Sequence, residues 1–348
     1  MSSPAVRVGV LGCARIALRR MLPAFSRTPG LDLAAVASRD PDKARAAAAE
    51  FGCRPVTGYA ALLERPDIDA VYVPLPAALH ESWVEAALRA GKHVLAEKPV
   101  TLTAGRTAAV LDLARARGLV LMENVMFVHH GQHAAVLSLL RAGEIGELRS
   151  FEATFTIPAP PDDDIRFRAD LGGGALSDVG VYPVRAAQHL LGPGVTVHAA
   201  VLTTGPGRTV DTAGAVLLRR DDGVTALLSY GMEHAYRSSY TLVGSTGRIT
   251  VERAFTPPAE HRPEILLDRG GRVEKRLLEA EDQVAATVRA FRAAILTGGA
   301  PELAAATLEQ ARLLDDVRRL AGPAPQRWPV APNGAPAGPD RQYTMDPP

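Results

Sequence analysis

Arg7-Val-Gly-Val-Leu-Gly-Cys-Ala-Arg-Ile-Ala-Leu-Arg-Arg-Met-Leu-Pro-Ala-Phe-Ser26 is the stretch that decides the predicted fold. Arg7–Leu11 is a short apolar run typical of a buried strand, and Arg15–Ser26 has the apolar spacing of a helix. Between them, residues 12–17 occupy the positions of a G-x-G-x-x-G motif, with alanine at the second and third glycines. In such a turn the first glycine bends the chain, and amides at the helix start bind a pyrophosphate. The predicted cofactor contacts are Gly12, Cys13, Ala14, Arg15 and Ile16.

The remainder of residues 1–122 alternates between short strands and helices. This alternation is typical of a parallel sheet with helices on both faces. Because the glycine turn opens the first such unit, a dinucleotide site is favoured over a plain strand–turn–helix connection. Residues 1–122 are therefore predicted to form an α/β domain of Rossmann type. Its further expected strands are Leu31–Ala37, Ala70–Val73, His93–Ala96 and Leu119–Met122, and its further helices are Pro41–Phe51, Leu79–Ala90 and Thr103–Arg117.

From residue 123 the pattern changes to consecutive strands separated by turn signals such as Asp222-Gly223. Consecutive strands with tight turns predict an antiparallel sheet, so residues 123–322 are expected to form an α+β domain. Residues 323–348 are rich in proline and are expected to form an irregular tail. The helices expected in the second domain are His133–Arg141, one near Val179–Leu191, Gln283–Leu296 and Pro301–Leu320; the strands are Glu147–Thr156, Val195–Thr204, Ala213–Arg219, Thr225–Tyr230, Ser239–Val243, Arg248–Val251, Ile265–Leu267 and Val273–Leu277.

Composition excludes several classes of protein. A formal net charge of +1 over 348 residues argues against nucleic acid or an anionic membrane as the main partner, because binding to either needs an excess of basic residues. No run of 18 apolar residues is present, and the N-terminus has no signal-peptide pattern. The two cysteines, Cys13 and Cys53, form no disulfide framework or metal spacing, so we expect a cytoplasmic protein.

The second predicted strand ends in Ser38-Arg39, where an NAD site would carry a carboxylate for the ribose 2′-hydroxyl. A hydroxyl and a guanidinium suit a 2′-phosphate instead, and Lys43 adds positive charge one helical turn later. The alternative is a solvated turn. Ser38, Arg39 and Lys43 therefore predict NADPH/NADP+ as the cofactor.

The strand His93–Ala96 is followed by Glu97-Lys98-Pro99. Ligands of α/β sheets bind at the carboxyl ends of the strands, so Lys98 is expected to project into that crevice. A lysine there can have its pKa lowered by burial or by a neighbouring cation, and can then protonate or hydrogen-bond an oxygen. The alternative is a surface lysine at a strand end.

A second group of polar residues follows the glycines at positions 172–174. Asp178 and Tyr182 are spaced i, i+4, so both lie on one face at the start of a helix. A phenol beside an ammonium group is a suitable proton donor to a ketone oxygen that receives a hydride. Lys98 and Tyr182 are therefore the predicted catalytic pair, although Tyr182 alone would also fit an amphipathic core.

Glu97-Lys98-Pro99, the Asp178-x-Gly180-x-Tyr182 segment and the degenerate turn at Gly12 together resemble the glucose–fructose oxidoreductase/inositol dehydrogenase (Gfo/Idh/MocA) family. The resemblance covers residues 6–320. It implies a Rossmann-type domain followed by a domain with a large open antiparallel sheet, through which members form homodimers or homotetramers. Two positions depart from the common family pattern: Tyr182 stands where many members have histidine, and Ala77 stands where many have asparagine.

Within the family, Tyr72-Val-Pro-Leu-Pro-Ala-Ala-Leu-His80 and Asp164-Ile-Arg-Phe-Arg168 look like the NDP-sugar 3-ketoreductases of antibiotic deoxysugar biosynthesis. That likeness implies NADPH-dependent reduction of the C3 keto group of an NDP-(dTDP-)3,4-diketo-2,6-dideoxyhexose to a 4-keto-3-hydroxy sugar. Alternatives are a sibling dehydrogenase of a free sugar, inositol or dihydrodiol, and a non-catalytic sugar or nucleotide sensor. The residues implied to contact the cofactor are Leu75, His80, Glu97, Lys98, Arg166 and Asp178, and those implied near the nucleotide sugar are Lys98, Asp178, Tyr182, Tyr236 and Thr256.

His129, His130 and His133 lie close together, and two of them are spaced i, i+4. No other ligand type is clustered beside them in the sequence, and Gly131 interrupts the helical pattern, so a structural role is favoured over a metal site.

Overall fold

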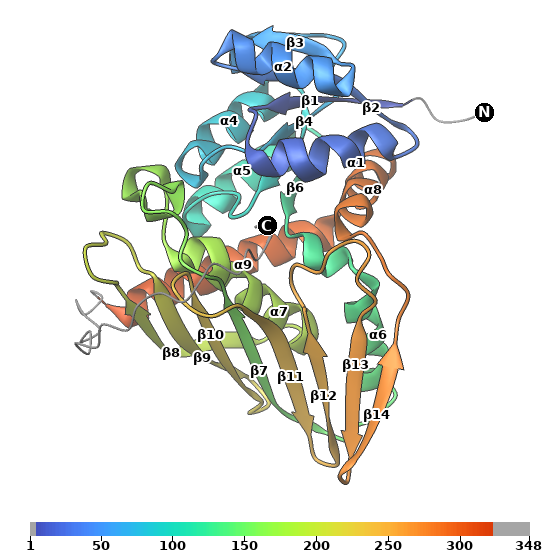
Figure 1. Ribbon diagram of the computed structural model, residues 1–348, viewed down its shortest axis with the longest axis vertical. Helices are drawn as coiled ribbons and strands as arrows, with labels where there is room; N and C mark the ends of the chain where they lie inside the picture. The colour runs from blue at the N-terminus through green and yellow to red at the C-terminus, as the bar shows by residue number, and fades with distance from the viewer. Residues whose placement is uncertain (1–4, 323–348) are drawn as a thin grey trace, which may run out of the picture.

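The computed structural model describes residues 5–322, which form two sheets with helices packed between and around them (Figure 1). The tail expected at residues 323–348 lies outside the described residues. Among residues 5–322, no helix has both the length and the apolar character needed to cross a membrane.

The first sheet is parallel throughout and has six strands in the order β3-β2-β1-β4-β5-β6. This confirms the Rossmann-type prediction. The strand order reverses between β1 and β4, which is the point where such sheets bind dinucleotides. β3 was missed because it is short and mostly exposed, without the apolar run of the inner strands. The strands are β1 (Val6–Leu11), β2 (Leu31–Ser38), β3 (Arg54–Thr57), β4 (Ala70–Val73), β5 (His93–Glu97) and β6 (Leu121–Asn124).

Helices cover both faces of this sheet, as the alternation predicts. The first helix begins with one π-helical turn, Ala17–Met21, before it continues as α1 (Leu22–Arg27). The others are α2 (Pro41–Phe51), α3 (Tyr59–Leu63), α4 (Ala77–Arg89) and α5 (Ala104–Ala116).

One helix from late in the chain also packs on the first sheet. The apolar side of α8 (Gln283–Thr297) joins the core beneath α1 through Val284, Val288 and Phe291 (Figure 1). The spacing of apolar residues in α8 predicts that one face of the helix is buried, but it does not predict against which sheet that face packs. The chain therefore returns to the first sheet after building most of the second, and the domain boundary at residue 122 stays a prediction.

The second sheet has eight strands in the order β14-β13-β12-β11-β7-β10-β9-β8. It is mostly antiparallel, as the turn signals predict, and one pair of neighbouring strands, β7 and β10, is parallel. β7 is a central strand that pairs with β10 on one side and with β11 on the other, and β9 and β8 follow beyond β10. Turn signals connect only strands that are consecutive in the chain, so they do not reveal that β7 lies between β10 and β11. The strands are β7 (Leu148–Thr156), β8 (Val195–Thr203), β9 (Ala213–Arg220), β10 (Thr225–Gly231), β11 (Arg237–Gly244), β12 (Gly247–Glu252), β13 (Glu264–Arg269) and β14 (Arg272–Leu277).

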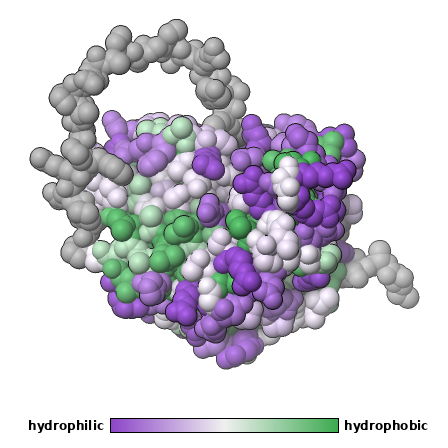
Figure 2. Space-filling view, turned by 90° about the horizontal axis from the view of Figure 1, so that it is seen from below, coloured by the Kyte–Doolittle hydropathy of each residue, from purple (hydrophilic) through white to green (hydrophobic). Residues whose placement is uncertain are grey.

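Alternation along these strands gives the second sheet one buried and one open face. Phe151, Phe155 and Tyr240 point into a core that α6 (Gly131–Arg141), α7 (Val181–Leu191) and α9 (Pro301–Ala321) close. On the opposite face the side chains of Val201 and Leu227 are 54% and 56% exposed. The strand pairing places both on one side of the sheet, and Figure 2 shows apolar side chains gathered in one area of the lower side of the molecule.

Candidate active site

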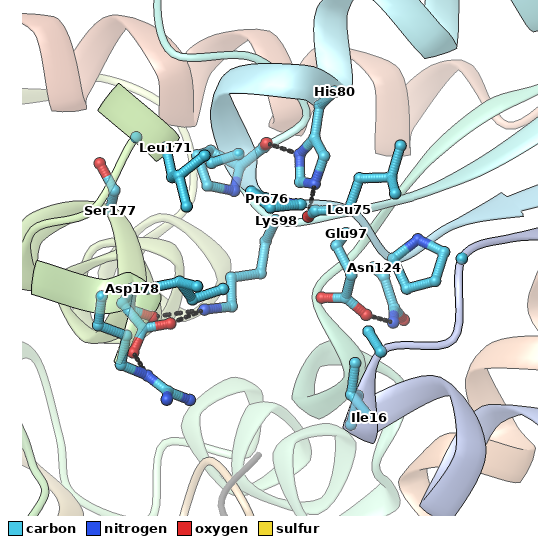
Figure 3. Close-up of a pocket in the computed structure, with 18 of the residues that line it drawn as sticks. Ile16, Leu75, Pro76, His80, Glu97, Lys98, Asn124, Leu171, Ser177 and Asp178 are labelled. Atoms are coloured by element: carbon cyan, nitrogen blue, oxygen red, sulfur yellow. Dashed lines mark hydrogen bonds and ion pairs between the residues drawn. The ribbon is translucent and has the colours of Figure 1, made fainter. Parts of the chain in front are cut away.

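A cavity of about 370 Å³ lies at the carboxyl ends of β1, β4 and β5, between the first sheet and the glycine-rich segment before α7. Figure 3 shows its lining side chains converging from these elements. Twelve of the residues predicted from the sequence line it: Gly12, Cys13, Ala14, Ile16, Leu75, His80, Glu97, Lys98, Arg166, Asp178, Tyr182 and Thr256. Arg15, Ser38, Arg39, Lys43 and Tyr236 do not line it.

The glycine turn forms one end of this cavity. Gly12 has φ of +126°, a conformation that side chains rarely adopt, and a Cβ at this position would lie 3.1 Å from Cδ2 of Leu75. Its amide donates to the Ala37 carbonyl at 2.9 Å, which fixes the turn beside the end of β2. The turn therefore requires glycine at this position, as the motif predicts.

The residues predicted to hold a 2′-phosphate lie just outside the cavity, beside the same turn. The Cys13 thiol lies 3.7 Å from the Lys43 carbonyl, and the buried Ser38 hydroxyl accepts a hydrogen bond from the Asp40 amide at 3.1 Å. Asp40 caps α2, as expected, by accepting from the amides of Asp42 and Lys43. Arg39 and Lys43 are exposed. The arrangement leaves two cations at the end of β2, where a nucleotide ribose binds in this fold.

Lys98 lies at the centre of the cavity and is almost completely enclosed, with 11% of its side chain exposed. Its Nζ donates to the carbonyl oxygen and to Oδ1 of Asp178, each at 2.7 Å (Figure 3). Burial alone would lower the pKa of Lys98, but the Asp178 carboxylate and the Tyr182 phenol outweigh it and leave the pKa raised. A lysine at this position can have its pKa lowered by a neighbouring cation, but here the neighbour is a carboxylate, which acts in the opposite direction.

Asp178 joins Lys98 to a second cation. Its Oδ2 accepts from Nε of Arg166 at 2.6 Å, and Arg166 also contacts Asp164 at 3.1 Å. Burial would raise the pKa of Asp178, but Lys98 and Arg166 outweigh that effect and hold it well below its usual range. The carboxylate is therefore ionised and keeps the Lys98 ammonium in one position.

Tyr182 lies beside this ion pair, within the aromatic core of the second domain. Its ring packs edge-on against Phe155 with centroids 4.8 Å apart, and Nζ of Lys98 is 5.4 Å from the ring centroid. Burial raises the pKa of the Tyr182 phenol, and the charge of Lys98 offsets this only in part. The phenol therefore remains a proton donor next to a fixed ammonium group.

Glu97 is held by two residues that sequence reasoning missed. Oε1 accepts from the Tyr72 hydroxyl and from Nδ2 of Asn124, each at 2.6 Å. The Asn124 amide oxygen is buried and has no hydrogen-bond partner among the described residues. Tyr72 lies near the carboxyl end of β4, and Asn124 is the last residue of β6. Because ligands of such sheets bind at the carboxyl ends of the strands, the position of Asn124 could have identified it as a site residue.

His80 ties two loops of the cavity wall together. Its Nδ1 lies 2.7 Å from the Pro99 carbonyl, and its Nε2 lies 2.6 Å from the Leu75 carbonyl. Burial lowers the pKa of His80, and a neutral imidazole has one N–H, so it donates to one of these carbonyls at a time. The Lys98–Pro99 peptide bond beside it is cis.

The loop between β12 and β13 contributes another part of the cavity wall. Thr256 lines the cavity, whereas Tyr236 lies behind it, with the two hydroxyls 3.5 Å apart. Sequence reasoning missed further lining residues, because none of them occupies a motif position: Arg20, Tyr59, Met126, Phe255 and Gln283.

The three neighbouring histidines lie outside this cavity. His133 is buried, with Nδ1 3.0 Å from the Tyr240 hydroxyl and Nε2 3.1 Å from the Ala254 carbonyl, and His130 caps α6. Gly131 begins that helix rather than interrupting it. Within the part of the chain that the structure describes, no group of three His, Cys, Asp or Glu side chains is arranged to hold a metal ion.

The fold and the cavity together define a class of protein: a dinucleotide-binding domain whose site is completed by an α+β domain. Residues 6–125 match the oxidoreductase family with an NAD-binding Rossmann fold, and residues 133–250 match the GFO/IDH/MocA C-terminal domain. The chain belongs to the Gfo/Idh/MocA family of oxidoreductases, which confirms the resemblance read from its motifs.

Within that family the chain is similar to sugar-nucleotide reductases. It is 54% identical over 327 residues to dTDP-3,4-didehydro-2,6-dideoxy-alpha-D-glucose 3-reductase of Streptomyces violaceoruber, covering 91% of this chain and 96% of the relative. The enzyme of that name from Saccharopolyspora spinosa is 56% identical over 294 residues, covering 84% and 88%. A crystal structure of KijD10, a 3-ketoreductase from Actinomadura kijaniata, in complex with NADP and TDP-benzene, matches with a TM-score of 0.89 at 50% identity, covering 92% of this chain and 98% of that one.

KijD10 has also been crystallised as single variants of one lysine and one tyrosine. Those two residues have the same separation along its chain as Lys98 and Tyr182 have here.

Proposed function

We propose that the protein reduces the C3 keto group of a dTDP-3,4-diketo-2,6-dideoxyhexose to the 4-keto-3-hydroxy sugar with NADPH, a step of deoxysugar biosynthesis for antibiotics. The observation that carries this proposal is the meeting of Lys98, Asp178 and Tyr182 at one end of a cavity whose other end is the Gly12 turn. The relatives described above support the same substrate class, because two are named as 3-reductases of such a dTDP-sugar and one 3-ketoreductase was crystallised with TDP-benzene.

The cavity fits a nicotinamide dinucleotide. Gly12 has no side chain, and a Cβ at this position would crowd Leu75. Because no side chain shields the turn, a pyrophosphate can approach the main chain of the turn closely. Deeper in the cavity, the buried oxygen of Asn124 offers an acceptor for a carboxamide N–H. Ser38, Arg39 and Lys43 would hold the 2′-phosphate that distinguishes NADPH from NADH.

When bound, NADPH supplies a hydride to C3 of the sugar, and the ketone oxygen must then gain a proton. We assign this step to Lys98 and Tyr182, which lie next to each other in the wall of the cavity. The Tyr182 phenol stays protonated because burial raises its pKa, and the Lys98 ammonium stays charged because Asp178 faces it. Together the pair provides a proton and a fixed positive charge for the developing alkoxide.

The open face of the second sheet supports self-association into a homodimer or homotetramer. Val201, Leu217 and Leu227 lie on this face in adjacent strands, and two of these side chains are more than half exposed. Exposed apolar side chains grouped in this way mark surfaces that bind another protein. A Leu227→Glu variant is expected to shift the protein to monomers in sedimentation; an unchanged mass would contradict this interface. A cytoplasmic location remains part of the proposal.

Turnover with the diketo sugar nucleotide tests the proposed function. The purified protein is incubated with NADPH and dTDP-3,4-diketo-2,6-dideoxyhexose, and NADPH oxidation and the reduced sugar are both measured. A free sugar, inositol and a dihydrodiol, each with NADP+, are the comparison substrates. Faster turnover of any of these would favour a sibling dehydrogenase, and binding of NADPH and sugar without turnover would identify a sensor.

A further inference from the structure

A buried ion pair joins the edge of the first sheet to the helix that carries Tyr182. Glu123 lies in β6 and Arg185 lies in α7, and Nη2 of Arg185 donates to Oε2 of Glu123 at 2.9 Å. Only 2% of the Glu123 side chain and 5% of the Arg185 side chain are exposed. Neither residue lines the active-site cavity, so the chemistry proposed above does not use them directly.

The other carboxylate oxygen of Glu123 holds the segment that follows Lys98. Oε1 accepts from the Val100 amide at 3.0 Å. The carbonyl of the same peptide group belongs to Pro99 and lies 2.7 Å from Nδ1 of His80. Because a peptide group is planar, contacts at both its nitrogen and its oxygen fix its orientation. This peptide group lies one residue beyond Lys98, so its orientation determines how the main chain of Lys98 is held.

The ion pair also reaches the region of α7 that faces the lysine. Arg185 lies three residues after Tyr182 in α7, and that helix continues the π-helical turn whose Asp178 binds Nζ of Lys98. The segment with Lys98 is therefore joined to this region twice, once through Asp178 and once through Glu123. A single contact allows rotation about itself, whereas two separated contacts fix the relative orientation of the segments that they join.

Stability alone explains a buried ion pair at this place poorly. Taking two charges out of water costs free energy that their attraction often fails to recover, and apolar pairs of similar size are commonly as stable. Nε2 of Gln310 in α9 adds a third donor to Glu123, at 3.3 Å from Oε2. Oε1 of Gln310 and Nε of Arg185 are buried without a hydrogen-bond partner among the described residues. A role in holding neighbouring segments at a fixed angle accounts for this polar cluster better.

We propose that Glu123 is a positioning residue: through Val100 on one oxygen and Arg185 on the other, it keeps the Lys98 ammonium beside the Tyr182 phenol. The inference rests on the proposed function and deepens it. A carboxylate suits this position because both of its oxygens accept, and each of them faces an N–H donor. Glutamine has the same shape but only one acceptor oxygen, so its NH2 group would have to face one of these donors.

Kinetics of Glu123→Gln in the full-length protein test the assignment. With NADPH and the diketo sugar nucleotide, we expect kcat to fall about 10- to 100-fold, because a displaced reacting group lowers the rate even where the substrate still binds. The KM for the sugar nucleotide and the Kd for NADPH should stay within about twofold of the wild type, since Glu123 does not line the cavity. In a Lys98→Ala background the same substitution should lower kcat less than about twofold, because the group that it positions is absent.

Nuclear magnetic resonance of the lysine side chains reports the same geometry without turnover. The chain contains only four lysines, so protein labelled with 13C at the lysine Cε atoms gives few signals, and Lys98→Ala identifies the signal of Lys98. We expect Glu123→Gln to shift the Lys98 signal and to leave those of Lys43 and Lys275 unchanged. A purely stabilising role for Glu123 would move none of them in the folded protein.

Asp69→Asn is the matched control. The Asp69 carboxylate also accepts from a main-chain amide and a guanidinium, both from Arg7 at 2.9 Å, but at the amino ends of the strands of the first sheet. This variant should keep kcat within about twofold of the wild type and leave the Lys98 signal in place. Its effect should appear at Lys92, because the Asp69 charge acts to raise the pKa of Lys92 against burial.

Either of two results overturns the assignment. One is an unchanged Lys98 signal in folded Glu123→Gln protein. The other is a loss of kcat that is as large in the Lys98→Ala background as in the wild type. Failure of the wild type to reduce the diketo sugar nucleotide would instead contradict the proposed function, and the lysine signals would still decide whether Glu123 positions Lys98.

A second pair of variants covers the case in which Glu123→Gln does not fold. Arg185→Gln removes the bridge to α7, and Arg185→Lys restores one cationic donor to Glu123. A lower kcat and a shifted Lys98 signal in Arg185→Gln, both partly recovered in Arg185→Lys, support the assignment. Wild-type values of kcat and of the Lys98 signal in both variants overturn it.

Discussion

Nζ of Lys98 donates to both the carbonyl oxygen and the carboxylate of Asp178, so one ammonium group is held by the main chain and the side chain of one residue. Lys98 follows the end of β5 in the first sheet, whereas Asp178 lies in the π-helical turn before α7. The contact therefore joins the two halves of the chain at the centre of the cavity. Any change in how the halves pack would move the ammonium group relative to the cofactor end of the site.

Replacing Lys98 by alanine is expected to lower kcat by about 10²–10⁴-fold, because the substitution removes the charge that would face the developing alkoxide. The KM for NADPH should change little, since the Gly12 turn is untouched. Steady-state kinetics measure both values. Lys275→Ala serves as the control, because Lys275 is exposed on β14, pairs with Glu264 and does not line the cavity.

Tyr182→Phe is expected to keep the fold and lose at least about 10²-fold in kcat. The phenylalanine ring preserves the packing against Phe155 and Phe255, so the thermal midpoint should stay near that of the wild type. Only the hydroxyl is removed. If both Tyr182→Phe and Lys98→Ala retain wild-type kcat, the proposed pair is wrong and the proton comes from another group.

Asp178→Asn is expected to change the pH dependence of kcat. With Asp178 ionised, the pKa of Lys98 is raised above its usual 10.5, so the lysine stays charged up to strongly alkaline pH and loses its proton only above that value. Without the carboxylate, burial dominates and lowers the pKa, so the alkaline loss of kcat should move to lower pH. Profiles of kcat from pH 6 to about 10 measure the shift. A variant whose kcat stays as constant as that of the wild type up to about pH 10 would show that Lys98 ionisation does not limit the rate.

Cofactor preference tests the two cations at the end of β2. Arg39→Ala should raise the Kd for NADPH about tenfold and leave the Kd for NADH unchanged, because the guanidinium would contact only the 2′-phosphate. Fluorescence titration of both nucleotides gives the ratio. Wild-type protein that binds NADH as tightly as NADPH would remove the basis of this prediction. Arg45→Ala, a neighbouring exposed arginine that pairs with Asp42, is the control.

The sequence predicted most of the first domain because its signals are local. The strand–turn–helix at Gly12 and the cap at Asp40 depend on residues within one turn of each other. Lys98, Asp178 and Tyr182 could be proposed from their motifs and their place after a strand or at a helix start. The direction in which the pKa of Lys98 is shifted could not be predicted, because it depends on the Asp178 carboxylate, 80 residues away along the chain. Asn124, Arg20 and Gln283 were missed for the same reason: only the folded chain brings them to the cavity.

Acid stability should depend on His133, which the structure assigns to the core rather than to a metal site. Burial, followed by the charges of His189 and His130, lowers the pKa of His133 to about 3. The unfolded chain has the ordinary histidine pKa of about 6.5, so between these values the unfolded state binds more protons than the folded state. The stabilising effect of the neutral ring is therefore present above pH 6.5 and lost as pH falls.

For this one residue the loss between pH 7.5 and pH 5 is about 2 kcal/mol. A His133→Gln variant keeps a hydrogen-bonding group beside Tyr240 but has no titrating ring. It should be less stable than the wild type at pH 7.5, yet its free energy of unfolding should fall by about 2 kcal/mol less on going to pH 5. Urea unfolding at both pH values measures the difference. If the free energy of unfolding falls equally in wild type and variant, the folded protein holds His133 in its protonated form at pH 5. The hydrogen bonds to Tyr240 and Ala254 would then outweigh the cost of burying the charge.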